Sequence, residues 1–268
     1  MERSLIFLSS FSVFPLQAAS AIALAKACRY DGVELFLHRR DRPQILNHLR
    51  DAQAMGLRCT MHQFWSYAES PTLLNACLQA LGYTEPEGYS LNGQVPPKTR
   101  VPTVIYAERI PESLQSRLGY DFRVQTCSLD ANGASKLPYE RFVQLVRKYN
   151  LPVCFDIQHA LEYLSGKLGV EHLPDSPDEL MSRLKRLWSD LGPYVKEIHL
   201  TDCHPRAGKR NVFPGDGLLP LFNFFGMLRE LRWHGDIVPE VSPVHLFPYR
   251  FGAARLRAHV QKLVEGRW

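Results

Sequence analysis

Residues 151–159 read Leu-Pro-Val-Cys-Phe-Asp-Ile-Gln-His, an apolar run that ends in a carboxylate and an imidazole. Two later stretches repeat this design: residues 195–202, Val-Lys-Glu-Ile-His-Leu-Thr-Asp, and residues 236–242, Asp-Ile-Val-Pro-Glu-Val-Ser. Each reads as a short buried strand, and a strand with an apolar body has no packing reason to end in Asp, His or Glu. The carboxyl ends of parallel strands meet at one mouth of a barrel, so we expect the polar ends to converge there. Asp, His and Glu together suit a divalent metal ion.

The rest of the chain extends this pattern to eight strands that alternate with helical segments. Turn signals such as Asp31-Gly32 and His234-Gly235 precede several of the strands. The expected strands are 5–8, 33–37, 58–63, 103–107, 122–127, 153–157, 197–201 and 237–241. The expected helices are 17–29, 42–55, 71–81, 138–149, 177–191, 219–233 and 251–264. A capping box, Ser176 to Glu179, opens the fifth helix. This alternation predicts an α/β fold, a single (β/α)8 TIM barrel over residues 1–268.

One segment does not fit an ordinary connection between a strand and a helix. Residues 82–102 are rich in Pro and Gly and contain no clear periodic pattern. We interpret this stretch as an insertion in the barrel, either a lid over its mouth or a disordered loop.

Composition indicates a globular protein that is only mildly basic. The chain has 268 residues, 45% of them hydrophobic, and an α/β barrel commonly takes about 250. A net charge of +5 weakly favours an anionic ligand and does not indicate nucleic-acid binding. The six cysteines form no Cys-x-x-Cys pair and are expected to be reduced thiols of a cytoplasmic protein. Ser9, Ser10, Ser12 and Pro15 interrupt the apolar N-terminal stretch, which we interpret as a strand rather than a signal peptide. No segment of the sequence suits a membrane span.

Several short motifs, taken in order, resemble one family of barrels. They are Gly32-Val-Glu34-Leu, Asp156-x-x-His159, Ile-His199-Leu-x-Asp202, Pro214-Gly-Asp-Gly217 and Pro-Glu240-Val. Their order and spacing resemble the xylose isomerase-like TIM-barrel superfamily, which includes sugar isomerases and epimerases, inosose and dehydroshikimate dehydratases, and nucleases of the endonuclease IV type. The resemblance implies that Asp156, His199 and Glu240 are metal ligands. It also implies that His159 contacts the substrate or supports the site.

One position departs from the isomerase pattern. A second Glu is normally found at the end of the fifth strand, and here Gln125 stands in its place. A Gln carbonyl can bind a cation, so Gln125 remains an expected ligand, but it cannot act as a general base. Three interpretations stay open: a reaction with one acid/base residue, a different reaction, or a shifted register. Glu108, at the end of the fourth strand, is a possible replacement carboxylate.

The nuclease-type pattern is followed less closely. That site has an Asp-x-His just before the Pro-Gly-Asp-Gly turn, where this chain reads Lys209-Arg210-Asn211. A His expected on the fourth strand is also missing from Thr-Val-Ile-Tyr106. We therefore do not expect nucleic acid as a partner.

Each candidate also has a structural interpretation. Asp156 could cap the helix that follows it, and His199 could be a core histidine. Glu240 is harder to explain by packing, because a buried carboxylate requires a partner. Glu34 could form an ion pair with an arginine inside the barrel mouth or contact the substrate.

The remaining expected substrate contacts lie in two loops. His62 closes the third strand and could contact the substrate or pack in the core. Trp65 follows that strand and could line a sugar face or fill the top of the core. Arg206, Lys209 and Arg210 follow the seventh strand and could hold a phosphate or carboxylate, or form a solvated basic loop.

Together these observations predict a metal-dependent isomerase or epimerase that acts on a small, anionic, polyhydroxylated or hydroxy-carbonyl substrate. One divalent ion, Mn²⁺, Mg²⁺, Co²⁺ or Zn²⁺, would stabilise an enediolate while Glu240 moves a proton, with His159 as the other catalytic residue. The alternatives are a dehydratase, lyase or hydrolase on the same metal site, or a barrel that has lost catalysis and only binds. The expected partner is a small molecule, without a membrane, and a homo-oligomer is compatible with the sequence.

Overall fold

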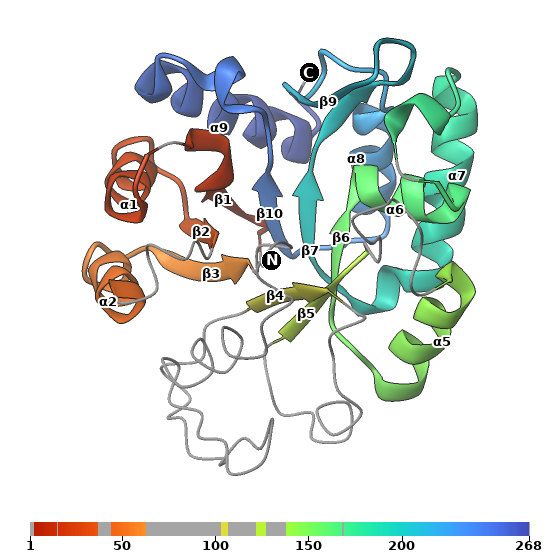
Figure 1. Cartoon of the computed structure of the whole chain (residues 1–268), viewed down its shortest axis with the longest axis horizontal. Helices are drawn as coiled ribbons and strands as arrows, with labels where there is room; N and C mark the ends of the chain where they lie inside the picture. Colours follow the sequence, from red (N-terminus) through yellow and green to blue (C-terminus); the bar gives the residue numbers. More distant parts are fainter. Residues whose placement is uncertain are drawn as a thin grey trace.

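A closed barrel of parallel strands forms the centre of the molecule (Figure 1). The computed structural model describes residues 3–14, 16–36, 44–62, 103–106, 122–126, 138–167 and 169–267. Within these residues, eight strands pair in the order β1-β10-β7-β6-β5-β4-β3-β2, and β1 pairs with β2 to close the ring. The strands are β1 (Leu5–Ser9), β2 (Gly32–Phe36), β3 (Arg58–His62), β4 (Thr103–Tyr106), β5 (Phe122–Gln125), β6 (Val153–Asp156), β7 (Val195–Leu200) and β10 (Asp236–Pro239). The predicted (β/α)8 barrel is confirmed, and each predicted strand is present to within one or two residues at its ends.

Helices surround the strands on the outside of the barrel (Figure 1). They are α1 (Ala18–Ala27), α2 (Ile45–Ala54), α5 (Tyr139–Tyr149), α6 (Ile157–Ser165), α7 (Pro177–Leu191), α8 (Leu221–Glu230) and α9 (Tyr249–Glu265). In α7, Leu180, Leu184, Leu187 and Leu191 recur on one buried face. The N-cap bond of the predicted capping box is present, since the Ser176 side chain accepts the Glu179 amide, while the Glu179 carboxylate pairs with Arg183. No helix among the described residues is long and apolar enough to cross a membrane.

Several sequence predictions fall outside the described residues. They concern the helix at 71–81, the insertion at 82–102, Trp65 and Glu108.

Alternation along the strands builds a polar interior. Cys154 is the register partner of Glu197, and Asp156 that of His199, so two layers of polar side chains lie inside the barrel. Phe155 lies between Cys154 and Asp156 on β6. Its side chain packs on the helices instead, against Trp188 of α7 and Phe224 of α8. Barrel interiors are usually filled by branched apolar residues, so polar layers at this depth indicate a site.

The structure adds a helix and a hairpin that the sequence did not predict. Helix α6 begins at the residue after β6, because the Asp156 carboxylate accepts the His159 amide and caps the helix. Strands β8 (Asp202–His204) and β9 (Lys209–Val212) then form an antiparallel hairpin, where we expected a basic loop.

The Pro-Gly-Asp-Gly turn is held by Asp202. Its buried carboxylate accepts the backbone amides of Cys203, Gly215, Gly217 and Leu219 at 2.8 to 3.1 Å. A Cβ at Gly217 would overlap the Asp202 carboxylate, so only glycine fits this close approach. Asp202 therefore shapes the loop that follows β9.

Candidate metal centre

His199 lies at the centre of a group of polar side chains inside the barrel, and it is fully buried. Its Nδ1 atom is 3.7 Å from Glu240 Oε1 and 3.9 Å from Asp156 Oδ2. Among the described residues, neither Nδ1 nor Glu240 Oε1 has a hydrogen-bond partner. Ligand atoms bound about 2.1 Å from one ion lie about 3 Å from each other, so a small inward movement of these atoms would suit a metal ion.

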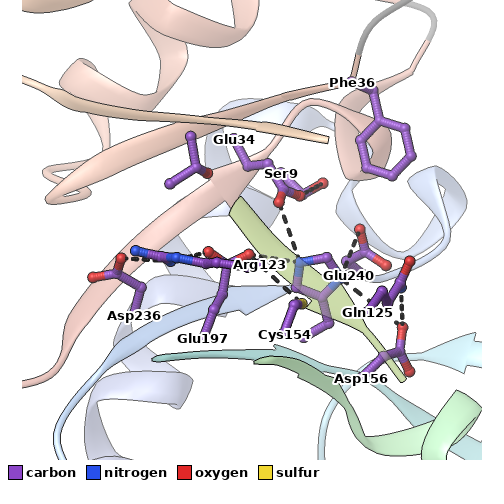
Figure 2. Close-up of polar contacts among 12 residues, drawn as sticks. Ser9, Glu34, Phe36, Arg123, Gln125, Cys154, Asp156, Glu197, Asp236 and Glu240 are labelled. Carbon is purple, nitrogen blue, oxygen red and sulfur yellow. Dashed lines mark hydrogen bonds and ion pairs between the residues drawn. The ribbon is translucent and has the colours of Figure 1, made fainter. Parts of the chain in front are cut away.

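Gln125 completes this group from β5. Its Nε2 donates to Asp156 Oδ2 at 3.2 Å (Figure 2). Its carbonyl oxygen Oε1 is buried and has no hydrogen-bond partner in the described part of the chain. The structure thus brings together the four residues that the sequence analysis named as ligands, with a neutral carbonyl where isomerases have a carboxylate.

The other nitrogen of His199 faces two more carboxylates. Nε2 lies 2.8 Å from Glu197 Oε1 and 3.1 Å from Glu34 Oε2. Acceptors on this side favour the tautomer with a proton on Nε2 and a lone pair on Nδ1. Glu34 therefore pairs with His199, and the arginine partner considered from the sequence is not found among the described residues.

Arg123 supplies the positive charge beneath this group. Its guanidinium lies between Glu197 and Asp236 (Figure 2), and forms an ion pair with each. Burial would raise the pKa of Glu197, but Arg123 and then His199 lower this pKa to about 2. Burial raises the pKa of Glu34 to about 7 against the opposing effect of His199.

Glu240, just beyond β10, also has a strongly shifted pKa. Burial, together with the neighbouring charges of Glu34 and Asp156, raises the pKa of this carboxyl to about 8, against the opposing effect of His199. A buried carboxyl that is reluctant to ionise without a cation is consistent with a site that binds one.

His62 borders the same group at the end of β3. Its ring stacks on Phe36 with centroids 4.3 Å apart and lies 5.2 Å from the His199 ring. One ligand atom each from His62, His199 and Glu240 lies within 4.8 Å of the others. His62, expected as a substrate contact, is therefore also placed near enough to approach a bound ion.

His159 and the basic residues meet at a second buried carboxylate, Glu162. His159 Nδ1 lies 3.1 Å from Glu162 Oε2, and Arg210 pairs with Glu162 Oε1. Arg206 is largely exposed and pairs with Asp175. Lys209 is exposed and pairs with no carboxylate within the described residues. Two of the three cations considered as an anion clamp thus already have acidic partners.

Sequence reasoning missed three of these residues: Arg123, Glu197 and Glu162. Arg123 and Glu197 stand two positions before Gln125 and His199, so strand alternation could have placed them in the interior. Glu162 lies on α6, a helix that was not predicted, so strand alternation could not have placed it.

Comparisons with known proteins agree with this architecture. Residues 133–261 match the model of the family described as xylose isomerase-like TIM barrel. Comparison with curated proteins gave no match.

Solved structures share the fold at low sequence identity. The D-psicose 3-epimerase of Clostridium cellulolyticum H10, solved with D-tagatose, is 13% identical with a TM-score of 0.59, over 97% of this chain and 99% of that one. A xylose isomerase domain protein of Planctomyces limnophilus is 11% identical with a TM-score of 0.62, over 98% of both chains. Endonuclease IV of Thermus thermophilus is 16% identical with a TM-score of 0.58, over 96% of this chain and 99% of that one. Residues 133–261 therefore match the xylose isomerase-like TIM barrel family that the motifs resemble, and the chain shares its fold with these solved structures.

Proposed function

We propose that this protein is a metal-dependent isomerase or epimerase of a small polyhydroxylated or hydroxy-carbonyl compound. The observation that carries the proposal is the position of His199 Nδ1, which faces the carboxylates of Asp156 and Glu240 without a hydrogen-bond partner among the described residues. A buried nitrogen left in this way is costly unless a ligand satisfies it.

Asp156, His199, Glu240 and the Gln125 carbonyl would hold the ion. Oxygen ligands with one imidazole accept Mn²⁺, Mg²⁺, Co²⁺ or Zn²⁺. When bound, such an ion supplies a Lewis acid that polarises a carbonyl and stabilises negative charge on oxygen. Because Gln125 is neutral, the four residues bring two carboxylate charges, which balance the charge of a divalent ion.

Glu240 and His159 are the residues proposed to move protons. Glu240 would remove a proton from the carbon next to the substrate carbonyl and deliver it to the neighbouring carbon. A single base on one face of the substrate can complete this transfer. Epimerisation requires proton delivery to the opposite face, and His159 is the candidate for that step. Gln125 can act neither as the base nor as the acid in these steps, because a side-chain amide does not accept or release a proton at neutral pH.

The substrate is proposed to be a small molecule. The epimerases among the structural neighbours are named for sugars, and the exposed Lys209 offers a cation to an anionic group. A nucleic-acid substrate has less support, because Lys209-Arg210-Asn211 replaces the nuclease motif before the Pro-Gly-Asp-Gly turn.

Metal content is the first test of this proposal. Elemental analysis of the purified protein, after incubation with Mn²⁺ or Zn²⁺, should give close to one ion per chain. Asp156→Ala and Glu240→Ala should each remove it, whereas Asp190→Ala, which changes a carboxylate on α7 far from the site in sequence, should retain it. Absence of bound metal in the wild type would reject the proposed site.

Turnover in deuterated water tests the reaction. Active isomerase or epimerase should incorporate deuterium at the carbon next to the substrate carbonyl. A metal-loaded protein that binds sugars or hydroxy acids without such exchange would instead be a binding barrel, the second candidate, which the replacement of a carboxylate by Gln125 favours.

A further inference from the structure

A line of alternating charges runs through the barrel interior to the candidate metal centre. Asp236 pairs with Arg123, and Arg123 pairs with Glu197 (Figure 2). Glu197 in turn lies 2.8 Å from His199 Nε2. All four residues are buried, and they come from the three strands β5, β7 and β10. The line ends at His199, whose Nδ1 faces both Asp156 and Glu240.

Stability alone does not explain this arrangement. Desolvating a guanidinium and two carboxylates costs free energy that their mutual attraction only partly repays, and well-packed apolar residues often replace such groups without loss. The interior of a TIM barrel offers such apolar packing as its ordinary solution. A role in orienting His199 accounts for both the position and the charge of Glu197.

We propose that Glu197, held by Arg123, is the positioning residue that fixes the tautomer and the orientation of His199. It accepts the Nε2 proton, which leaves the Nδ1 lone pair directed at the space between Asp156 and Glu240. Metal-binding histidines commonly depend on a carboxylate at their other nitrogen in this way. The inference rests on the proposed metal centre for its function, although the hydrogen bond itself does not require a bound ion.

Glu34 also lies near Nε2, so the two carboxylates must be distinguished. Glu197 is closer, at 2.8 Å against 3.1 Å, and it receives the charge of Arg123. Glu34 instead accepts a hydrogen bond from the neutral Ser9 hydroxyl at 3.5 Å. Geometry and charge therefore both make Glu197 the stronger acceptor.

The test compares Glu197→Gln with Asp236→Asn. Both substitutions remove one carboxylate partner of Arg123, but only Glu197 touches His199. Titration calorimetry with Mn²⁺ alone should give about 10- to 100-fold weaker binding for Glu197→Gln, and binding within about 3-fold of wild type for Asp236→Asn. Equal losses in the two variants would overturn the inference, because the effect would then come from disturbing Arg123.

A second readout needs no metal. Burial lowers the pKa of His199, but its neighbours raise this pKa well above the ordinary value, so the spectra are recorded at alkaline pH, where the ring is neutral. There, in metal-free wild-type protein, the ¹⁵N shifts of the His199 ring should show a proton on Nε2 and a lone pair on Nδ1. Glu197→Gln should mix the tautomers, since an amide can donate to Nε2 as well as accept from it, whereas Glu34→Gln should leave the wild-type tautomer. An unchanged tautomer in Glu197→Gln would overturn the inference even if the protein binds metal.

These outcomes separate the inference from the proposed function. A wild-type protein that binds no metal, but shows the Nε2 tautomer only with Glu197 intact, would reject the function and retain the positioning role. If Glu197→Gln fails to fold, Glu197→Asp keeps the charge beside Arg123 and withdraws the carboxylate from His199. It should weaken Mn²⁺ binding in the same direction, and wild-type affinity in Glu197→Asp would contradict the inference.

Discussion

The side-chain amide of Gln125 donates a hydrogen bond to Asp156 Oδ2, with 3.2 Å between the two atoms. This contact joins the residue that departs from the isomerase pattern to a carboxylate that the pattern retains. The amide gives Asp156 a donor in the metal-free protein, and a carboxylate in its place would not. Gln125 therefore favours the protein without a metal ion, and it offers a cation less negative charge than a glutamate would.

Gln125→Glu should consequently have opposite effects on the metal-free and the metal-loaded protein. Without metal, the lost hydrogen bond and the repulsion from Asp156 should lower the free energy of unfolding by about 1 to 3 kcal/mol. With Mn²⁺ at saturation, the added charge should tighten metal binding and restore stability. Urea unfolding in chelator and in excess Mn²⁺ would show both effects.

Gln125→Met is the matched control, because it removes the amide without adding charge. It should destabilise the metal-free protein and also weaken Mn²⁺ binding. If Gln125→Glu left metal affinity unchanged, the Gln125 carbonyl would not lie among the ligands.

Glu162 should make stability depend on pH in the acid range. Burial alone would raise the pKa of this carboxyl, but His159 and Arg210 together lower it below its ordinary value of 4.5. A depressed pKa in the folded state means that the stabilisation is complete above the unfolded value and is lost as pH falls through the folded value. The free-energy difference between wild type and Glu162→Gln should therefore be larger at about pH 6 than at about pH 3.

Chemical unfolding of both proteins across this range is the measurement. Glu179→Gln, which removes an exposed carboxylate that pairs with Arg183 on α7, is the control and should show a much smaller dependence. A constant difference between wild type and Glu162→Gln over the whole acid range would mean that Glu162 is not held ionised by its neighbours.

The Pro-Gly-Asp-Gly turn offers a test of local packing. Gly217→Ala should destabilise the protein by about 1 to 3 kcal/mol, because its Cβ would displace the Asp202 carboxylate from four backbone amides. Gly226→Ala, inside α8, is the control: its Cβ would meet nothing closer than Arg229 at 3.6 Å and should stabilise the helix by about 0.5 to 1 kcal/mol. Urea unfolding should show a lower free energy of unfolding for Gly217→Ala and a higher one for Gly226→Ala. Equal changes in the two variants would show that Asp202 does not organise the turn.

The sequence predicted the barrel well because each strand carries its own local signal. An apolar run between turn residues marks a strand whatever its neighbours are, and the polar ends of β6, β7 and β10 marked the mouth of the barrel. Asp156, His199 and Glu240 could therefore be placed together from spacing and strand order.

Other features depend on contacts between distant parts of the chain. Helix α6 was missed because Asp156 both ends a strand and caps a helix, which leaves no loop between them to mark the boundary. The hairpin of β8 and β9 was missed because Lys209-Arg210-Asn211 has a polar, loop-like composition. Arg210 was interpreted as a clamp for an anion because its partner, Glu162, is 48 residues away.

Arg210 and Lys209 should therefore behave differently when they are replaced. Arg210→Met would leave the buried Glu162 carboxylate with His159 and Gln158 as its side-chain partners among the described residues. Because Arg210 itself is only half-buried, we expect this loss to cost about 1 to 3 kcal/mol. Lys209 is exposed, so Lys209→Met should change the free energy of unfolding by less than about 0.5 kcal/mol. Urea unfolding of the two variants measures this contrast directly.

Glu162→Leu combined with Arg210→Met provides the control. The double variant removes both charges, so it should regain part of the stability lost in Arg210→Met. A role for Arg210 as a free anion clamp predicts the reverse: unchanged stability in Arg210→Met and weaker binding of anionic sugars. Lys209→Met should weaken binding of an anionic compound, relative to its neutral analogue, if the hairpin of β8 and β9 faces the substrate.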